Sequence, residues 1–126
     1  MLLNLSDLSD EPLQGQIARQ IRAKILSGEL EAGYMLPSIR ALARDEKVSV
    51  ITVQRGYELL EKDGLIISRR GKGYFVNDLQ GSEKRKLASE RLTENLEPII
   101  KHAMDEGMTI EEIKNIVDKI TKLLSL

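Results

Sequence analysis

Six cationic side chains fall in the middle of the chain, at spacings that can bring them to one surface. Residues 38–76 hold eight basic and five acidic residues, a net charge of +3, although the whole chain has a net charge of −1. Clustered cations can bind phosphates, because this attraction is local and is screened within about 10 Å at ordinary salt. A charge of +3 is by itself a modest indication of a nucleic-acid partner. The six residues are Arg40, Arg44, Arg55, Arg69, Arg70 and Lys72.

Residues suited to covalent or metal chemistry are almost absent. The chain has no cysteine, which excludes thiolate nucleophiles, disulfides, zinc fingers and iron–sulfur ligation. Its one histidine, His102, has no nucleophile or metal-ligand partner at a suggestive spacing. The glycines at 71 and 73 match neither the GxGxxG nor the GxxxxGK[ST] phosphate-binding pattern. We therefore expect no enzyme, no metal and no cofactor, with His102 at a surface or a subunit interface.

Composition and length set the class of protein. Hydrophobic residues make up 41% and charged residues 31% of 126 residues, which is typical of a globular protein that fills its own core. The length allows a small domain with an appendage but not two full-sized domains. No apolar run approaches the length of about 20 residues that spans a bilayer, and the chain does not open with a signal peptide. We expect a cytoplasmic protein that does not bind a membrane.

The elements that must position the cations begin with three helices. A repeat of apolar residues every four positions predicts a first helix over residues 11–26, with Ser9 or Asp10 as its N-cap. Ser38 is placed to cap a short second helix that ends at Asp45 or Glu46, and Ser49 to cap a third over residues 49–62. The residues expected to face the core are Leu13, Ile17, Ile21, Ile25, Ile39, Leu42, Ala43, Val53, Tyr57 and Leu60.

Two short runs of strand-forming residues follow the third helix. Residues 65–68 and 74–76 predict the two strands of an antiparallel hairpin. We call the whole hairpin, residues 65–76, the wing. The tip has the sequence Arg69-Arg70-Gly71-Lys72-Gly73. Its glycines allow positive φ angles and a close approach to a neighbour, and its three cations give it a positive charge.

The sequence beyond residue 79 predicts only helices. A linker at residues 80–82 is followed by a helix over 83–105, in which Pro98 should produce a kink or an interruption. After a turn at Gly107, Thr109 and Glu112 form a capping box that starts a last helix. We divide the chain into domains 1–78 and 79–126 and expect the second to pair two copies. The expected pairing residues are Leu92, Leu96, Ile99, Ala103, Ile113, Ile116, Ile120 and Leu123.

The order of these elements predicts a mainly α fold with a small β-hairpin, a winged helix-turn-helix followed by a two-helix dimerisation tail. Several motifs resemble the GntR family of bacterial regulators, and the short helical tail resembles its YtrA subfamily. The resemblance covers the first 75 or so residues. It is carried by the stretch Leu36-Pro37-Ser38-Ile39-Arg40-Ala41-Leu42-Ala43-Arg44, then Val48-Ser49, Thr52-Val53-Gln54-Arg55, Leu60, Gly64-Leu65-Ile66 and Gly71-Lys72-Gly73-Tyr74-Phe75-Val76.

The resemblance implies a set of DNA contacts, each of which has a plainer alternative. Phosphate contacts are implied for Ser38 and Arg40, where the alternative for Ser38 is a helix cap alone, and for Arg44, where it is a solvated surface arginine. On the third helix an arginine can read guanine, a glutamine adenine and a valine a thymine methyl, and which of them reads bases stays open. The wing tip either contacts the minor groove or phosphates, or is a solvated turn. The full set is Ser38, Arg40, Arg44, Ser49, Val50, Thr52, Gln54, Arg55, Arg69, Arg70, Gly71, Lys72 and Gly73.

The resemblance therefore implies a sequence-specific transcription regulator, a repressor that binds a palindromic operator on double-stranded DNA as a homodimer. The alternative is a winged-helix adaptor that binds proteins instead of DNA. Ser49-Val50-Ile51 stands where the subfamily often has Asn-Pro-Asn, so the operator should differ from those of its relatives. Gly56 stands where alanine is frequent, which either weakens the helix by about 1 kcal/mol or permits closer packing. A small-molecule effector is neither indicated nor excluded.

Overall fold

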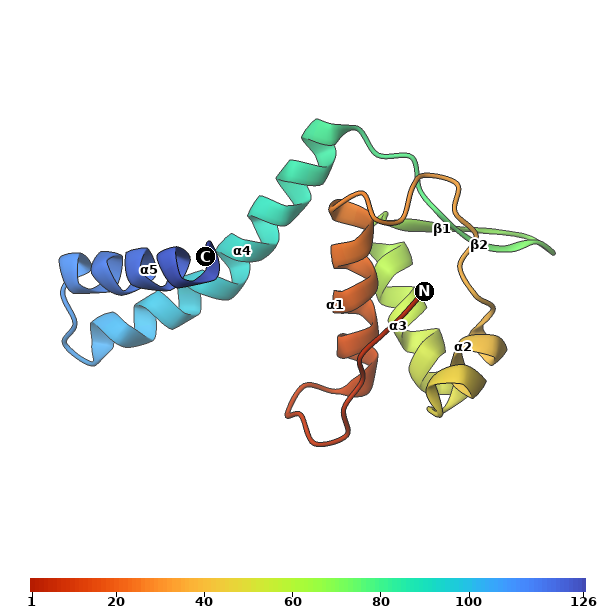
Figure 1. Cartoon of the computed structure of the whole chain (residues 1–126), viewed down its shortest axis with the longest axis horizontal. Coiled ribbons are helices and arrows are strands. Elements are labelled where there is room, and N and C mark those ends of the chain that lie inside the picture. The colour runs from red at the N-terminus through yellow and green to blue at the C-terminus, as the bar shows by residue number, and fades with distance from the viewer. The chain divides into compact units, whose positions relative to one another are not determined.

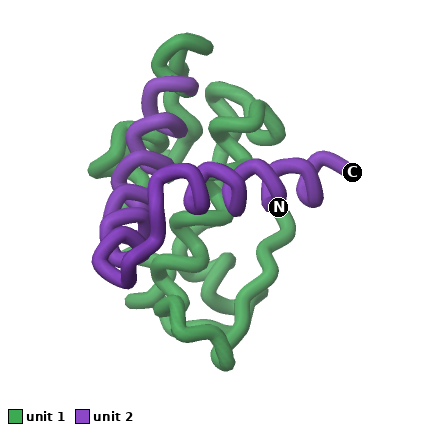
Figure 2. Tube along the Cα trace, turned by 90° about the vertical axis from the view of Figure 1, so that its left-hand side faces the viewer, with its two compact units in different colours: residues 1–84 green, residues 85–126 purple.

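A computed structural model describes all residues 1–126 and confirms the mainly helical fold with one small hairpin (Figure 1). Five helices and two strands follow one another in the order α1, α2, α3, β1, β2, α4, α5. The chain divides into two compact units, Met1–Lys84 and Arg85–Leu126 (Figure 2), which we describe separately. None of the helices combines the length and the hydropathy that a membrane span requires.

The core of the first unit lies between α1 (Leu13–Leu26) and α3 (Val50–Lys62), which pack side by side. Three isoleucines of α1 and the predicted stripe of α3 meet here, and all six side chains are almost completely inaccessible to solvent. Each such aliphatic side chain contributes about 1.5–3 kcal/mol of hydrophobic stabilisation. The six residues are Ile17, Ile21, Ile25, Val53, Tyr57 and Leu60.

The predicted start of α1 is wrong by two residues. Pro12 is itself the N-cap, with ψ at 145°, and no side chain caps the helix. Since the backbone at Pro12 is extended, helical hydrogen bonding begins only after it, with the amide of Gln16 donating to the carbonyl of Pro12 at 3.0 Å. Ser9, one of the expected caps, instead accepts a hydrogen bond from the amide of Glu11 at 3.1 Å.

The predicted caps of α2 and α3 are confirmed. The hydroxyl of Ser38 accepts from the amide of Ala41 at 3.1 Å at the start of α2 (Ile39–Glu46). The hydroxyl of Ser49 accepts from the amide of Thr52 at 3.1 Å at the start of α3. Between the two helices Lys47 takes the left-handed conformation with φ at 57°, which gives the sharp turn of a helix-turn-helix.

The wing is a two-stranded antiparallel hairpin of β1 (Ile66–Arg69) and β2 (Gly73–Val76). Both strands lie within one residue of their predicted bounds, and the tip turns at Arg70-Gly71-Lys72. An extended segment at residues 33–36, which the sequence did not indicate, pairs with the outer edge of β2. The amide of Leu36 donates to the carbonyl of Tyr74, and that of Val76 to the carbonyl of Tyr34, both at 2.9 Å.

The second unit contains α4 (Gly81–Asp105) from Arg85 onward and α5 (Ile110–Leu124). The linker expected at residues 80–82 is mostly helix, because Glu83 reaches back to the amide of Gln80 at 3.3 Å and supports an earlier start. Pro98 does not interrupt α4, which Figure 1 shows as one continuous ribbon that bends partway along its length, so of the two predicted effects the structure has the bend and not the break. The capping box of α5 is confirmed, with both Thr109–Glu112 hydrogen bonds present.

Gly56 brings α3 unusually close to α1. A Cβ atom added there would lie 3.0 Å from Cγ2 of Ile17 and 3.3 Å from the carbonyl oxygen of Gln14. Contacts this short require the neighbours to move, and both belong to the tightly packed α1. Of the two explanations for this glycine, the structure supports close packing.

Gly56→Ala should destabilise the protein by about 1 kcal/mol, because crowding against Ile17 exceeds the gain in helix propensity. The matched control is Gly15→Ala in α1, where the new Cβ would only make an ordinary 3.6 Å contact with Glu11. That variant should gain about 0.5–1 kcal/mol. Thermal unfolding of both variants checks the pair, and equal shifts in the same direction would contradict the close-packing explanation.

Candidate nucleic-acid interface

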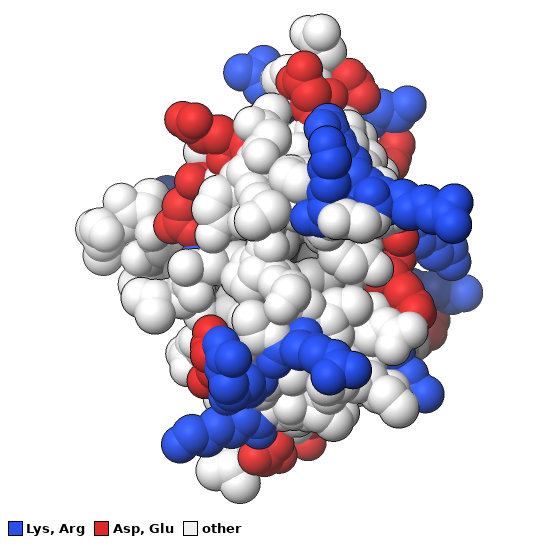
Figure 3. Space-filling view, turned by 90° about the vertical axis from the view of Figure 1, so that its right-hand side faces the viewer, with Lys and Arg blue, Asp and Glu red and all other residues white.

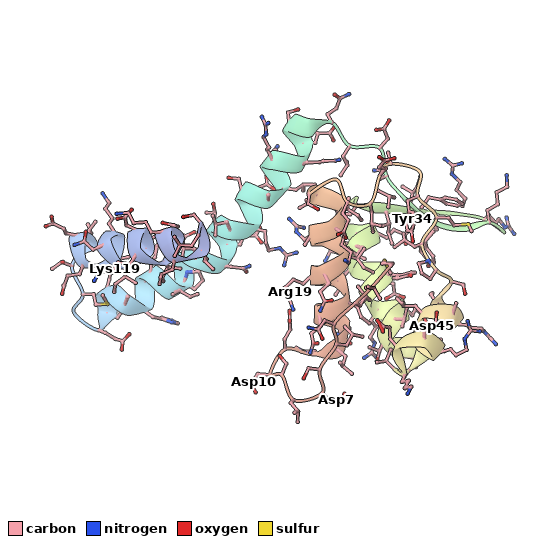
Figure 4. All side chains as sticks on the ribbon, viewed as in Figure 1. Asp7, Asp10, Arg19, Tyr34, Asp45 and Lys119 are labelled. Carbon is pink, nitrogen blue, oxygen red and sulfur yellow. The ribbon has the colours of Figure 1, made fainter.

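The outer side of α2 presents two of the predicted phosphate-binding cations. Arg40 and Arg44 are exposed and lie one helical turn apart. Arg44 donates to the carboxylate of Asp45 at 3.3 Å, in an exposed pair at the end of α2 (Figure 4). Exposed pairs of this kind contribute little to stability, so a phosphate can replace the carboxylate at small cost. Ser38 stands at the N-terminus of the same helix, whose free amides suit an anion.

The outer face of α3 presents the predicted Gln54 and Arg55, but the predicted Thr52 is only partly exposed. Ser49 and Thr52 hydrogen-bond each other through their hydroxyls at 2.8 Å, and Thr52 is half-buried, so both lie at the side of the helix. The residues opposite the buried stripe are Ile51, Gln54, Arg55 and Glu58, all exposed. Ile51 was not among the predicted contacts. Its position four residues before Arg55 is the signal that could have identified it.

Gln54 is held by its neighbour one turn later. Its side-chain Nε2 donates to Oε1 of Glu58 at 3.2 Å. The second Nε2 hydrogen and the carbonyl oxygen of the same amide stay free, which leaves Gln54 one donor and one acceptor. That pair is what a bidentate contact with adenine requires.

The tip of the wing holds the second set of cations. The guanidinium of Arg69 lies over the ring of Phe75, 5.2 Å from its centre, while Arg70 and Lys72 are exposed and form no ion pair. Gly71 and Gly73 have φ angles of 74° and 112°, which side chains rarely adopt, so the tight turn depends on glycine. β1 is tied to α3 near the wing tip by a 2.8 Å hydrogen bond from Ser68 to Glu61.

Seen from the side that carries the wing tip, the lysine and arginine side chains gather in two groups with uncharged surface between them (Figure 3). The upper group lies at the height of the wing tip and the lower group at the height of α2. The protein thus presents two positive regions on one face although its net charge is −1. This separation explains why the net charge is a poor guide to the partner.

Tyr57 fixes α3 relative to the start of α2. Its buried hydroxyl donates to the carbonyl of Pro37 at 2.7 Å, and its ring meets that of Tyr74 edge-on, with centres 5.1 Å apart. Burial raises the pKa of the Tyr57 hydroxyl far above its ordinary value of 10.0, with smaller effects from Tyr34 and Tyr74. The neutral tyrosine therefore couples three parts of the interface: α3, the start of α2 and the wing.

Comparison with known sequences identifies the family. Residues 13–76 match the bacterial regulatory proteins of the gntR family, over just the part of the chain that contains α1, α2, α3 and the wing. The chain belongs to the GntR family. It is therefore a DNA-binding transcription regulator and not an enzyme, and the candidate residues described above all lie within the part of the chain that matches this family.

Relatives of similar length place the GntR chain more closely. It is 38% identical to the uncharacterized HTH-type transcriptional regulator YhcF of Bacillus subtilis, over 83% of this chain and 86% of YhcF. It is 28% identical to the HTH-type transcriptional repressor YtrA of the same organism, over 95% and 92% of the two chains. The structure of YtrA from Sulfolobus acidocaldarius, a GntR-family transcription factor, superimposes with a TM-score of 0.58 at 30% identity, covering 98% and 100%. The protein is a YtrA-like GntR regulator.

Tyr57→Phe should lower the free energy of unfolding by about 1 kcal/mol at pH 7, because the carbonyl of Pro37 loses its donor. Since the pKa of Tyr57 is higher in the folded than in the unfolded state, the neutral hydroxyl stabilises the folded state fully below pH 10. This stabilisation is lost as the pH rises above that value. Between about pH 9 and pH 11, the free energy of unfolding should therefore fall less for Tyr57→Phe than for wild type.

Denaturant unfolding at several pH values measures both effects. Tyr34→Phe is the control at pH 7, because the exposed Tyr34 hydroxyl makes no hydrogen bond that could be lost (Figure 4). If the free energy of unfolding fell equally steeply with rising pH for wild type and Tyr57→Phe, the raised pKa of the Tyr57 hydroxyl would be contradicted.

Proposed function

We propose that this GntR regulator is a repressor that binds a palindromic operator as a homodimer, with α3 in the major groove and the wing along the DNA backbone. This placement on DNA is supported by the exposed cations on α2, α3 and the wing that form no ion pairs. These are Arg40, Arg55, Arg70 and Lys72. The name of the B. subtilis relative, a transcriptional repressor, supports repression over activation. This GntR regulator acts in the cytoplasm, where bacterial DNA lies.

The phosphate contacts are assigned to the periphery of the interface. Ser38 and Arg40 bind one phosphate at the N-terminus of α2, where free amides and the exposed Arg40 side chain are available, and Arg44 exchanges Asp45 for a second. The wing tip, from Arg69 to Gly73, binds the backbone or the minor groove. Ser49 and Thr52 act mainly on each other and hold the start of α3 in place beside the groove.

Base reading is assigned to the outer face of α3. Arg55 projects a free guanidinium, which suits the two acceptors of guanine, and Gln54 offers a donor and an acceptor suited to adenine. Val50 lies one turn before Gln54 and completes the predicted set on this helix.

The homodimer is supported by the lack of a core in the second unit. No residue of α4 or α5 is buried, and in Figure 2 α5 leaves α4 at a wide angle instead of packing along it. Two helices without a buried face are not stable on their own. Leu92 is 62% and Leu123 69% exposed, which is unfavourable unless another surface covers them.

We assign this cover to the second unit of another copy, so that residues 79–126 pair two DNA-binding domains of residues 1–78. Pairing lets two α3 helices read two half-sites of a palindrome. The exposed stripe contains Leu92, Ile99, Ile116, Ile120 and Leu123, and the half-buried Leu96, Ala103 and Ile113 line the same faces of α4 and α5.

Arg55→Ala should weaken operator binding by about 1–3 kcal/mol while affecting random DNA much less, because a base contact is lost. Lys72→Ala should weaken binding to operator and random DNA alike and should reduce the dependence of affinity on salt by about one counterion. Gel-shift titrations at several salt concentrations separate the two roles. Equal losses on operator and random DNA for Arg55→Ala would contradict base reading.

Ile120→Lys should convert the dimer into monomers and weaken operator binding, because a charge would enter the apolar contact between two α5 helices. The matched control is Asn115→Lys, another exposed position, on the opposite, polar side of α5. Sedimentation velocity at micromolar concentration gives the oligomeric state. An Ile120→Lys protein that sediments like wild type would refute the dimer interface.

A further inference from the structure

Two large apolar side chains are exposed in the first turn of α3, on the helix assigned to the major groove. Val50 is 46% and Ile51 58% exposed, whereas the other side of the helix is almost completely buried. Both are β-branched residues that burial normally favours and that bring no advantage to a solvated helix surface. No other part of the first unit covers them, so the fold itself does not explain why they are there.

The position of the pair ties it to the DNA-reading residues. Ile51 lies three residues before Gln54 and four before Arg55, so all three are neighbours on the outer face of α3. Val50 lies four residues before Gln54 and flanks the same surface. The apolar pair is therefore adjacent to an amide and a guanidinium that are both free to meet base edges.

The residues around Val50 and Ile51 indicate which partner contacts these two side chains. The exposed cations of α2, α3 and the wing suit a polyanion, and DNA binding is the function of the family. The floor of the major groove carries one apolar group, the 5-methyl of thymine. The hydroxyls of Ser49 and Thr52 are bonded to each other, which uses one of their two hydroxyl hydrogens and leaves one free as a polar donor beside the apolar pair.

We propose that Val50 and Ile51 are specificity residues that contact thymine methyl groups, so that each half-site carries one or two thymines opposite the start of α3. This inference rests on the proposed placement of α3 in the major groove. A methyl group buried in such a contact is worth about a fourfold change in affinity, so two methyl groups give about 16-fold.

The experiment uses the full-length protein and DNA duplexes in which thymine is replaced by uracil, which lacks only the methyl group. Selection from a random duplex library first gives the operator. Uracil is then placed at each thymine in turn, and the affinity is measured by fluorescence anisotropy. Wild type should bind uracil-substituted half-sites about fourfold more weakly at one or two positions per half-site.

Variants then connect those positions to the two side chains. Ile51→Ser should bind thymine and uracil operators with the same affinity at one of the sensitive positions, and Val50→Ser, which removes both side-chain methyl groups, should do so at the neighbouring one. The matched control is Leu59→Ser, a similarly exposed apolar residue at the far end of α3, which should discriminate like wild type. Circular dichroism melting confirms that all three variants are folded.

The possible failures are distinguishable. An enriched operator that binds equally well with uracil at every position would overturn the methyl contacts and leave sequence-specific DNA binding intact. Undiminished thymine discrimination by both Ile51→Ser and Val50→Ser would overturn the assignment to these residues. Enrichment of no sequence at all would overturn the proposed sequence-specific regulator and this inference with it.

Discussion

The packing of α3 against α1 at Gly56 is the contact on which the rest of the DNA-binding unit depends. Because Gly56 has no side chain, the backbone of α3 comes close to Ile17 and Gln14, and the stripe around Tyr57 is buried almost completely. α2 and β1 both pack on α3 in turn. Because α2 and β1 pack on α3, the close packing of α3 against α1 also determines where the cations on α2 and the wing lie.

One helix thus has two functions that are separated by its faces. The inner face of α3 supplies core side chains and the hydroxyl of Tyr57, which positions the start of α2 through Pro37. The outer face is left free for polar groups and for the exposed Ile51, which contribute nothing to the core. Electrostatics follows the same division, since the positive regions lie on one side of a molecule whose overall charge is close to zero.

The two units differ in how they reach stability. The first has its own buried core, whereas the second has two helices with sound caps but no buried residue. A helix with a good capping box at Thr109 has a defined start, yet its apolar side gains free energy only when another surface covers it. In the proposed dimer the association of two second units therefore determines both their folding and the spacing of the two DNA-binding units.

The sequence by itself determined the helices, their caps at Ser38, Ser49 and Thr109, and the family, because these depend on local periodicity, short-range hydrogen bonds and fixed motif spacing. Only the tertiary structure decided that Gly56 serves close packing, that residues 33–36 pair with β2, and that Ile51 lies on the exposed face of α3. Each of these depends on which surfaces meet across long stretches of chain. The positive charge of residues 38–76 was indicated by clustered cations in the sequence, but its division into two groups required the fold that places α2 and the wing tip apart.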